Sequence, residues 1–537
     1  HEAITIAMEM YNITKDRQYY DLAFLYAQNT KSFVLLSEIK STEVIKFSEL
    51  PDNLIDREYD LSNEIAAYEE MIFNEQTSFN PDSIILTRFR EKLFNLNDDY
   101  NTLIDSIELN YPKYFELKYN PKFFSPSEIQ EKIRKNEALV EYVLIDSILT
   151  TFVIDSKKIN VIQQTLSPDF PEQCISYFSL LQNQDFSNDV HATYKEYVQM
   201  ARNFYEILIA PVLEVTRSRD ITFIPDGEIM YLPFESFLTY DVDQEYINYR
   251  KLPYLIYDVS VGYSYSSTLL YSERIRSKSP IKKVLAYAPS YENLLGDEIS
   301  LVWNRQANPD MLMPLPGARD EVRTIAQTVP SVVFLDENAS EENFKKNAPN
   351  YSILHLAMHT IMDDENPMYS KLAFTRDLSD TTQDYNLYTY EIYNMKLNAS
   401  MVVLSSCSSG FGKMQKGEGM MSMSRGFIYA GCPSIVMTLW QVSDLSSADL
   451  MSSFYMYLKK GYSKKKSLRE AKIDYLRKSD NLKSNPYFWS AFMLVGDSSP
   501  LYGPSPIIFI MLALVVLIAG YFIYKYRHRL VSIIRKK

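Results

Sequence analysis

Two residues of this chain have side chains that together make a nucleophile and a base, and each follows a run of apolar residues. His359 ends the run SILHLAMH that begins at Ser352, and Cys407 follows the run MVVLSS that begins at Met401. Nearly unbroken apolar runs of this length are typical of strands that helices cover on both faces. In such sheets, reactive side chains gather beyond the carboxyl ends of the strands. We therefore expect the Cys407 thiol and the His359 imidazole to lie at one edge of a parallel sheet, where the imidazole takes the thiol proton.

This pair predicts hydrolysis of peptide bonds by a cysteine nucleophile. A thiol is mostly protonated near neutral pH, so a neighbouring imidazole has to accept its proton before the sulfur attacks a carbonyl carbon. The negative charge that then forms on the carbonyl oxygen needs N–H donors. We predict these donors to be the backbone N–H groups of Cys407 and of Thr360, the residue after His359. This chemistry requires no metal and no cofactor.

The histidine and the cysteine nearest to this pair have simpler interpretations. His355 lies inside the first run among apolar neighbours, which predicts a buried, hydrogen-bonded structural residue. In a strand, its spacing from His359 does not reproduce the helical geometry with which histidine pairs bind metal, so no metal site is predicted. Cys432, in the segment AGCP, is predicted to be a small buried apolar residue. The sequence contains no G-x-S-x-G motif, which argues against a serine hydrolase.

Strand-like and helical segments alternate from about residue 137 onward. Further apolar runs of strand type are 138–144, 149–154, 221–224, 284–288, 332–335, 434–440 and 489–495. Helical patterns separate several of them, including 320–328, 420–430 and a helix that Ser446 is predicted to cap. Such alternation predicts an α/β fold with a mostly parallel sheet flanked by helices. Residues 1–130 have helical periodicity instead and are predicted to form a separate α-helical region.

Charge and cysteine content argue against some kinds of partner and some kinds of protein. The 537 residues carry 55 basic and 68 acidic side chains, which gives a net charge of −13. Because binding to phosphates needs a basic surface, no direct contact with nucleic acid is expected. Three cysteines, at 174, 407 and 432, are too few and too scattered for a disulfide framework or a cysteine-rich metal site.

The C-terminal region has the composition of a membrane anchor. Residues 507–524, IIFIMLALVVLIAGYFIY, contain no charged side chain, and this is about the length that spans a bilayer as a helix. Lys and Arg are frequent in the tail 525–537 and absent from 486–506. By the positive-inside rule, we predict a single-pass membrane protein whose basic tail is cytoplasmic and whose main domain lies on the outer side of the cytoplasmic membrane.

Motifs along the second part of the chain resemble those of CHAT domains. They are PDG at 225–227, LPFE at 232–235, LPGA at 315–318, HLAMH at 355–359, LSSC at 404–407, GEG at 417–419, YAG at 429–431 and LWQVSD at 439–444. CHAT domains are caspase-like peptidases of the clan that includes caspases, metacaspases, gingipains and separase, and they commonly follow tetratricopeptide repeats. The distance of 48 residues between the histidine and the cysteine (407 − 359) is similar to the roughly 50 residues found in caspases.

The resemblance implies a caspase-like domain over 137–497, with His359 as base and Cys407 as nucleophile. It also implies a protein or peptide substrate. The helical residues 1–130 then resemble the end of a tetratricopeptide-like array, which implies that a regulatory protein binds there.

Three further positions bear on substrate binding and on the oxyanion hole. Many members of the family carry glycine where Thr360 stands. Metacaspases carry aspartate where Ser405 stands, so Ser405 gives no support for cleavage after Arg or Lys. Asp444 is a candidate source of negative charge in the substrate cleft.

The sequence thus predicts a membrane-anchored cysteine endopeptidase regulated through its helical region. The alternative is a catalytically silent CHAT-fold signalling or scaffold protein.

Overall fold

The computed structural model describes most of the chain, in two compact units. The described residues are 2–31, scattered positions between 51 and 75, 82–111, 123–182, 189–271, 281–291, 312, 314–361, 363, 370–376, 385–405, 414–415, 419–420, 423–440, 442, 444–502 and 521–522. One unit spans Glu2–Ser125 and the other spans Pro126–Lys537. The Cys407 position predicted to be the nucleophile lies outside the described residues.

The first unit is helical in its described parts, as the sequence predicts. It contains α1 (Glu2–Thr14), a helical stretch over 17–31 and the long helix α4 (Ser83–Asn110). Asp82 caps α4 by accepting hydrogen bonds from the backbone N–H groups of Ile84 and Ile85.

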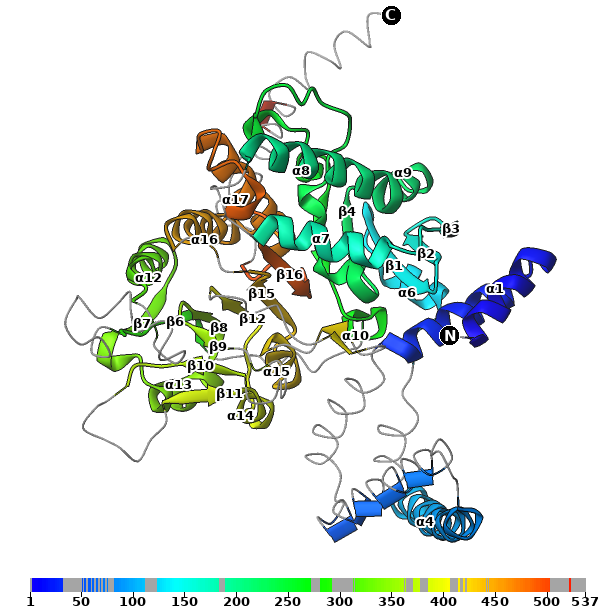
Figure 1. Ribbon diagram of the computed structural model, residues 1–537. Helices are drawn as coiled ribbons and strands as arrows, with labels where there is room; N and C mark the ends of the chain where they lie inside the picture. The colour runs from blue at the N-terminus through cyan, green and yellow to red at the C-terminus, as the bar shows by residue number, and fades with distance from the viewer. Residues whose placement is uncertain are drawn as a thin grey trace, which may run out of the picture. The chain divides into compact units, whose positions relative to one another are not determined.

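The second unit is built around one large sheet. Its strands, in the order of their hydrogen-bonded neighbours, are β3 (Ile159–Thr165), β2 (Ile148–Asp155), β1 (Glu137–Ile145), β4 (Asp220–Ile224), β5 (Ser260–Tyr263), β16 (Phe492–Gly496), β15 (Ser434–Thr438), β12 (Met401–Leu404), β8 (Tyr351–Leu356), β6 (Ile281–Ala288) and β7 (Ser331–Leu335). Figure 1 shows how strands from distant parts of the sequence lie side by side in this sheet. Only the pairs β3–β2, β2–β1 and β16–β15 are antiparallel, so the sheet is mostly parallel, as predicted.

The antiparallel pair β16–β15 divides the parallel strands into two sets that run in opposite directions. One set is β1, β4, β5 and β16, and the other is β15, β12, β8, β6 and β7. The sequence does not predict this reversal, because β16 is the last strand of the chain but inserts between β5 and β15. The carboxyl ends of β12, β8 and β6 therefore share one edge of the sheet.

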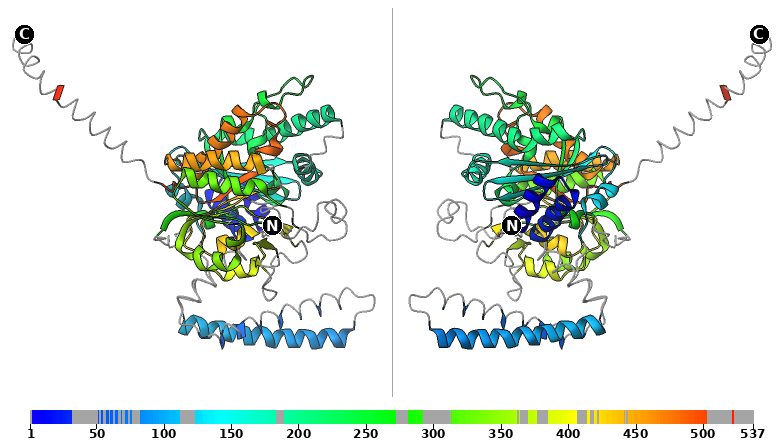
Figure 2. Two further views of the ribbon diagram at one scale, coloured as in Figure 1. Left: turned by 90° about the vertical axis from the view of Figure 1, so that its left-hand side faces the viewer. Right: turned by 90° about the vertical axis from the view of Figure 1, so that its right-hand side faces the viewer.

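Helices cover both sides of the second set of strands. Helices α12 (Pro316–Thr328) and α16 (Asp444–Lys459) pack together on one side, and α17 (Lys464–Lys478) lies beside α16, over β5 and β16 of the first set. Helices α13 (Glu341–Asn347), α14 (Thr389–Asn394) and α15 (Met423–Tyr429) lie on the other (Figure 1 and Figure 2). The other α-helices that the structure describes in this unit are α6 (Pro126–Lys132), α7 (Phe170–Gln182), α8 (Val190–Phe204), α9 (Ala210–Val215) and α10 (Ser267–Tyr271). Because helices enclose them, β8, β12 and β15 consist almost entirely of buried residues.

Two small sheets accompany the large one. Strands β9 (Thr360–Ile361), β10 (Lys371–Ala373) and β11 (Asn386–Tyr388) form an antiparallel sheet directly after β8. Strands β13 (Met414–Gln415) and β14 (Gly419–Met420) form an antiparallel pair in the segment that follows β12.

The predicted membrane helix is not supported by the structure. No helix among the residues that the structure describes is long and apolar enough to cross a membrane. A span needs about 20 consecutive helical residues that are mostly apolar. Apart from Tyr521 and Phe522, the predicted segment 507–524 lies outside the described residues. The predictions of a transmembrane helix and of a single-pass membrane localisation are therefore wrong, because an apolar run and the Lys and Arg distribution around it do not by themselves establish a spanning helix.

Candidate active site

Strands β8 and β12 precede the two residues that the sequence predicts to react, and they are neighbours in the large sheet. They pair in parallel, with Leu356 opposite Leu404. The ladder continues one residue further, because the backbone N–H of Ser405 donates to the carbonyl oxygen of Leu356 at 3.0 Å. Both strands therefore leave the sheet at the same edge and at the same level. His359 lies three residues after the end of β8, and Cys407 follows three residues after the end of β12 in the sequence.

His359 lies between two strands that fix its backbone on either side. It is half-buried, and it links β8 to β9 of the small sheet. Its carbonyl oxygen accepts a hydrogen bond from the N–H of Ala373 at 3.0 Å. Its own N–H donates to the hydroxyl oxygen of Tyr291 at 3.2 Å, and the centroid of the imidazole lies 4.8 Å from that of the Tyr291 ring.

Thr360 begins β9 directly after His359. It is buried and pairs with Leu372 of β10. Residues paired in an antiparallel ladder alternate between hydrogen-bonded and non-hydrogen-bonded pairs. Because Ala373 bonds to His359, the next pair along is a non-hydrogen-bonded one, and the N–H of Thr360 points away from β10. Thr360 is not among the described residues with a positive φ, so threonine fits this backbone without the strain that φ > 0 would impose.

The other predicted site residues are only partly placed. Ser405 is half-buried, and its backbone N–H belongs to the sheet ladder. Asp444 is the first residue of α16, two residues earlier than the predicted cap Ser446, whose hydroxyl instead contacts that of Tyr475 at 2.9 Å. Cys407 lies outside the described residues.

His355 is a buried structural residue, as predicted. Its side chain is fully buried, with Nδ1 3.2 Å from the hydroxyl oxygen of Tyr455 in α16 and Nε2 2.9 Å from Oε1 of Glu321 in α12. These contacts tie β8 to the two helices on one side of the sheet. The sequence gives no signal for this role of Glu321, because its partner lies 34 residues away (355 − 321).

The two described cysteines are buried thiols. Cys432 has no exposed surface, and its Sγ contacts the carbonyl oxygen of Ser434 at 3.2 Å, which agrees with the predicted buried role. Burial raises the pKa of the Cys174 thiol far above its usual range. Neither is a candidate nucleophile, because a reactive thiol is accessible and has a lowered pKa.

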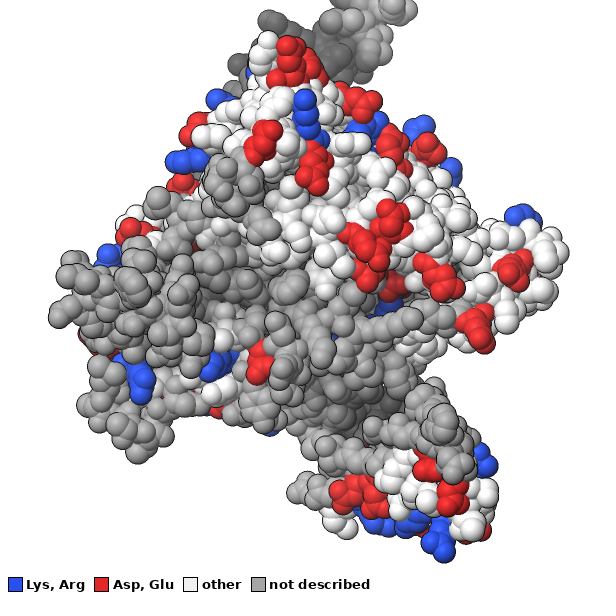
Figure 3. Space-filling view, viewed as in Figure 1, with Lys and Arg blue, Asp and Glu red and all other residues white. Residues whose placement is uncertain are grey.

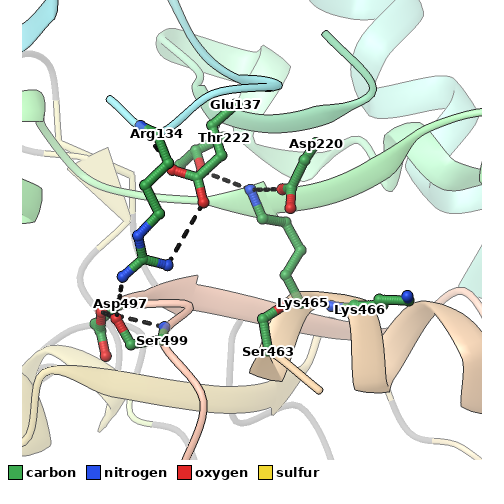
Figure 4. A network of polar contacts seen from close by, with 9 residues as sticks. All are labelled: Arg134, Glu137, Asp220, Thr222, Ser463, Lys465, Lys466, Asp497 and Ser499. Atoms are coloured by element: carbon green, nitrogen blue, oxygen red, sulfur yellow. Dashed lines mark hydrogen bonds and ion pairs between the residues drawn. The ribbon is translucent and has the colours of Figure 1, made fainter. Parts of the chain in front are cut away.

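A cavity of about 570 Å³ lies elsewhere in the second unit. Its lining includes Pro433 and Gly496, where β15 begins and β16 ends, at the sheet edge opposite to His359. Charged groups beside the cavity have polar or charged partners, as Figure 4 shows. Arg134 lies 3.6 Å from Glu137, and the Lys465 ammonium donates to the hydroxyl of Thr222 at 3.0 Å. Lys465 also forms an ion pair with Asp220. The sequence gives no signal for this cavity, because its walls come from many separate elements.

The exposed surface carries both signs of charge. On the face shown in Figure 3, acidic and basic side chains are interspersed over the described residues. Groups of three or more potential metal ligands do not occur among the residues that the structure describes.

The fold and a match to a family profile define the class of protein. A mostly parallel α/β sheet presents a histidine beyond the end of one strand, and the sequence places a cysteine beyond the end of its neighbour. The sequence profile of the CHAT domain matches residues 198–497, which is more than half of the chain. The chain belongs to the CHAT-domain family.

Comparisons with individual proteins give more distant similarities. The chain is 23% identical to mouse tetratricopeptide repeat protein 28 over 353 residues, which cover 57% of this chain and 14% of that protein. The human protein of the same name is 23% identical over 389 residues, which cover 63% of this chain and 15% of that protein. The chain thus spans only about a seventh of the length of these relatives.

Solved structures with a similar course of the chain were also found. The separase–securin complex of Saccharomyces cerevisiae matches with a TM-score of 0.42 and 13% identity, over 86% of this chain and 40% of that chain. The Arg-specific cysteine proteinase gingipain R matches with a TM-score of 0.31 and 9% identity, over 62% of this chain and 74% of that chain.

Proposed function

We propose that this protein is a caspase-like cysteine endopeptidase in which His359 is the base and Cys407 the nucleophile. The observation that carries the proposal is the pairing of β8 with β12, which ends at the same level in both strands. Membership of the CHAT-domain family supports the same assignment.

The covalent chain limits how far the two residues lie from each other. Neighbouring strands in a sheet are about 4.8 Å apart, and three residues reach at most about 11 Å. The chain therefore keeps His359 and Cys407 each within about 11 Å of the end of the strand that precedes it. Those two strand ends are adjacent in the sheet. This range includes the separation of about 3–4 Å between sulfur and nitrogen that proton transfer needs.

The proposed reaction begins when His359 accepts the proton of the Cys407 thiol. The thiolate then attacks the carbonyl carbon of a peptide bond, and the imidazolium returns the proton to the leaving amine. Water hydrolyses the resulting thioester and regenerates the thiol. The N–H groups of Thr360 and Cys407 are the proposed donors to the oxyanion.

The substrate of such a site is a protein or peptide. A regulatory protein bound to the helical residues 1–130 remains a prediction. Neither Ser405 nor Asp444 supports a particular cleavage specificity.

The test is covalent labelling of the intact chain by a peptide that carries a thiol-reactive electrophile. The wild type is compared with Cys407→Ala, His359→Ala and the control Cys432→Ala, and the labelled residue is identified by mass spectrometry. We expect labelling at Cys407 that persists in Cys432→Ala and falls by about 100-fold in His359→Ala, within the range of general-base catalysis. Labelling of Cys407 at the same rate with and without His359 would instead favour a scaffold that keeps the fold for binding.

A further inference from the structure

Tyr291 occupies an unusual place beside His359. It lies three residues after the end of β6, which is the neighbour of β8 on the side away from β12. Its ring is almost fully buried, with 2% of its surface exposed. It therefore comes from the third of three adjacent strands whose carboxyl ends meet at the edge that carries His359.

The hydroxyl of Tyr291 is inserted into the ladder between β9 and β10. His359 and Ala373 lie opposite each other, and residues in such a pair normally exchange two direct N–H to carbonyl hydrogen bonds. One of these bonds is present, from the N–H of Ala373 to the carbonyl of His359 at 3.0 Å. The second is replaced by a bridge: the N–H of His359 donates to the Tyr291 hydroxyl oxygen at 3.2 Å, and that hydroxyl donates to the carbonyl of Ala373 at 2.7 Å.

The segment that carries Tyr291 is itself held in place. The N–H of Ser290 donates to the hydroxyl oxygen of Thr375 at 3.0 Å, and that hydroxyl donates to the carbonyl of Asp336 at 2.6 Å. The Tyr291 ring also contacts the imidazole of His359, with 4.8 Å between centroids and 58° between ring planes. The hydroxyl of Tyr291 therefore fixes the backbone of His359, and the Tyr291 ring restricts the positions that the imidazole can take.

We infer that Tyr291 is a positioning residue for His359, a role that rests on the proposed function of His359 as the base. Without the Tyr291 hydroxyl, the N–H of His359 and the carbonyl of Ala373 either lose their shared partner or approach each other directly. Both outcomes move the backbone of His359 relative to β8, and with it the imidazole. Small displacements of a catalytic group have large effects on rate.

The test compares Tyr291→Phe with the matched control Tyr142→Phe in the full chain. Tyr142 is also fully buried and donates its hydroxyl to a backbone carbonyl, that of Leu208, at 2.6 Å. Both substitutions remove one oxygen from a buried phenol, but Tyr142 belongs to β1 in the other set of strands. A loss of stability that any buried tyrosine hydroxyl would cause is therefore measured by the control.

Two readouts separate this inference from the proposed function. In Tyr291→Phe, we expect the limiting rate of Cys407 labelling to fall about tenfold, with the half-saturating probe concentration unchanged and no such fall in Tyr142→Phe. Independently of any activity, we expect hydrogen exchange of the His359 amide, resolved by fragmentation in the mass spectrometer, to rise at least about tenfold because its buried acceptor is gone.

Each combination of results decides one of the two claims. A labelling rate in Tyr291→Phe equal to that in Tyr142→Phe would overturn the positioning role. If the wild type shows no labelling that depends on His359, the proposed function fails, and amide exchange alone decides whether Tyr291 holds this backbone. Unchanged exchange of the His359 amide in Tyr291→Phe would then overturn the inference by itself.

Discussion

Replacement of Lys472 by methionine is expected to destabilise the second unit strongly, because it breaks a buried ion pair. Lys472 of α17 has no exposed surface, and its ammonium lies 2.9 Å from Oε1 of Glu235, which is 3% exposed. The other carboxylate oxygen accepts a hydrogen bond from the hydroxyl of Tyr263 at 2.8 Å. Glu235 is the last residue of the LPFE motif, so this contact gives that motif a structural role.

The expected magnitude follows from the burial of both groups. Methionine keeps most of the apolar stem of lysine, so the change removes chiefly the charge and leaves Glu235 with Tyr263 but without its cation. Removing one partner of a buried ion pair costs about 3–5 kcal/mol. In the double variant Lys472→Met/Glu235→Gln no unpaired charge remains, and we expect it to recover about 2 kcal/mol of that loss, as is usual for coupled neighbours.

The assay is urea unfolding followed by tryptophan fluorescence. All three tryptophans, at 303, 440 and 489, belong to the second unit, so the signal reports on the part of the chain that contains the pair. Lys478→Met, at an exposed position of the same helix, is the control and is expected to change the free energy of unfolding by less than about 0.5 kcal/mol. Glu235→Gln alone is measured as well. If the losses of unfolding free energy in Lys472→Met and in Glu235→Gln add up to the loss in the double variant, the two residues are not coupled and the reasoning is refuted.

Other substitutions test single features of the fold. Gly496→Ala is expected to lower the free energy of unfolding in urea by about 2–4 kcal/mol. The reason is that Gly496 has φ = +92° and an added Cβ would lie 2.3 Å from the carbonyl oxygen of Pro433. An unchanged unfolding midpoint would contradict this geometry. Burial raises the pKa of Asp497, but Lys464 and other hydrogen-bond donors outweigh it and hold that pKa below its usual value. The carboxylate therefore contributes stability above pH of about 4 that is lost as the pH falls through its lowered pKa. The difference in free energy of unfolding between wild type and Asp497→Asn, measured in urea, should therefore shrink from pH 6 to pH 3. Cys432, with no exposed surface, is expected to resist alkylation by iodoacetamide until urea unfolds the unit, and rapid alkylation of the native chain would show that it is accessible.

Local patterns in the sequence predict much of the sheet but not its assembly. The runs 138–144 and 149–154 become the hairpin of β1 and β2, and Asp146 in its turn adopts φ = 53°. The run ending at His359 becomes β8, which stops at Leu356, because the chain then leaves the large sheet for the small one. In each case, a few neighbouring residues determine the strand, so the sequence pattern is sufficient.

The remaining features depend on contacts between residues far apart in the chain. The position of β16 between β5 and β15 reverses the direction of half the sheet, and nothing in its own sequence indicates its neighbours. Tyr291 is 68 residues from His359 (359 − 291), in a segment without a motif, and its role depends on a single hydroxyl between two strands. The apolar run 507–524 shows the opposite failure, because its composition predicts a membrane helix and no described helix is long and apolar enough to be one.

The most direct test of the central claim is the pH dependence of Cys407 alkylation in the native full chain. Iodoacetamide reacts with the thiolate, so the rate at Cys407, measured by mass spectrometry of the peptide that contains it, follows the pKa of this thiol. The imidazole of His359 should stabilise the thiolate, so the account predicts a midpoint well below about 8.5, the value of a free cysteine, and a return towards that value in His359→Gln. A midpoint at or above about 8.5 that is the same in both proteins would contradict the assignment of His359 and Cys407 as a catalytic pair.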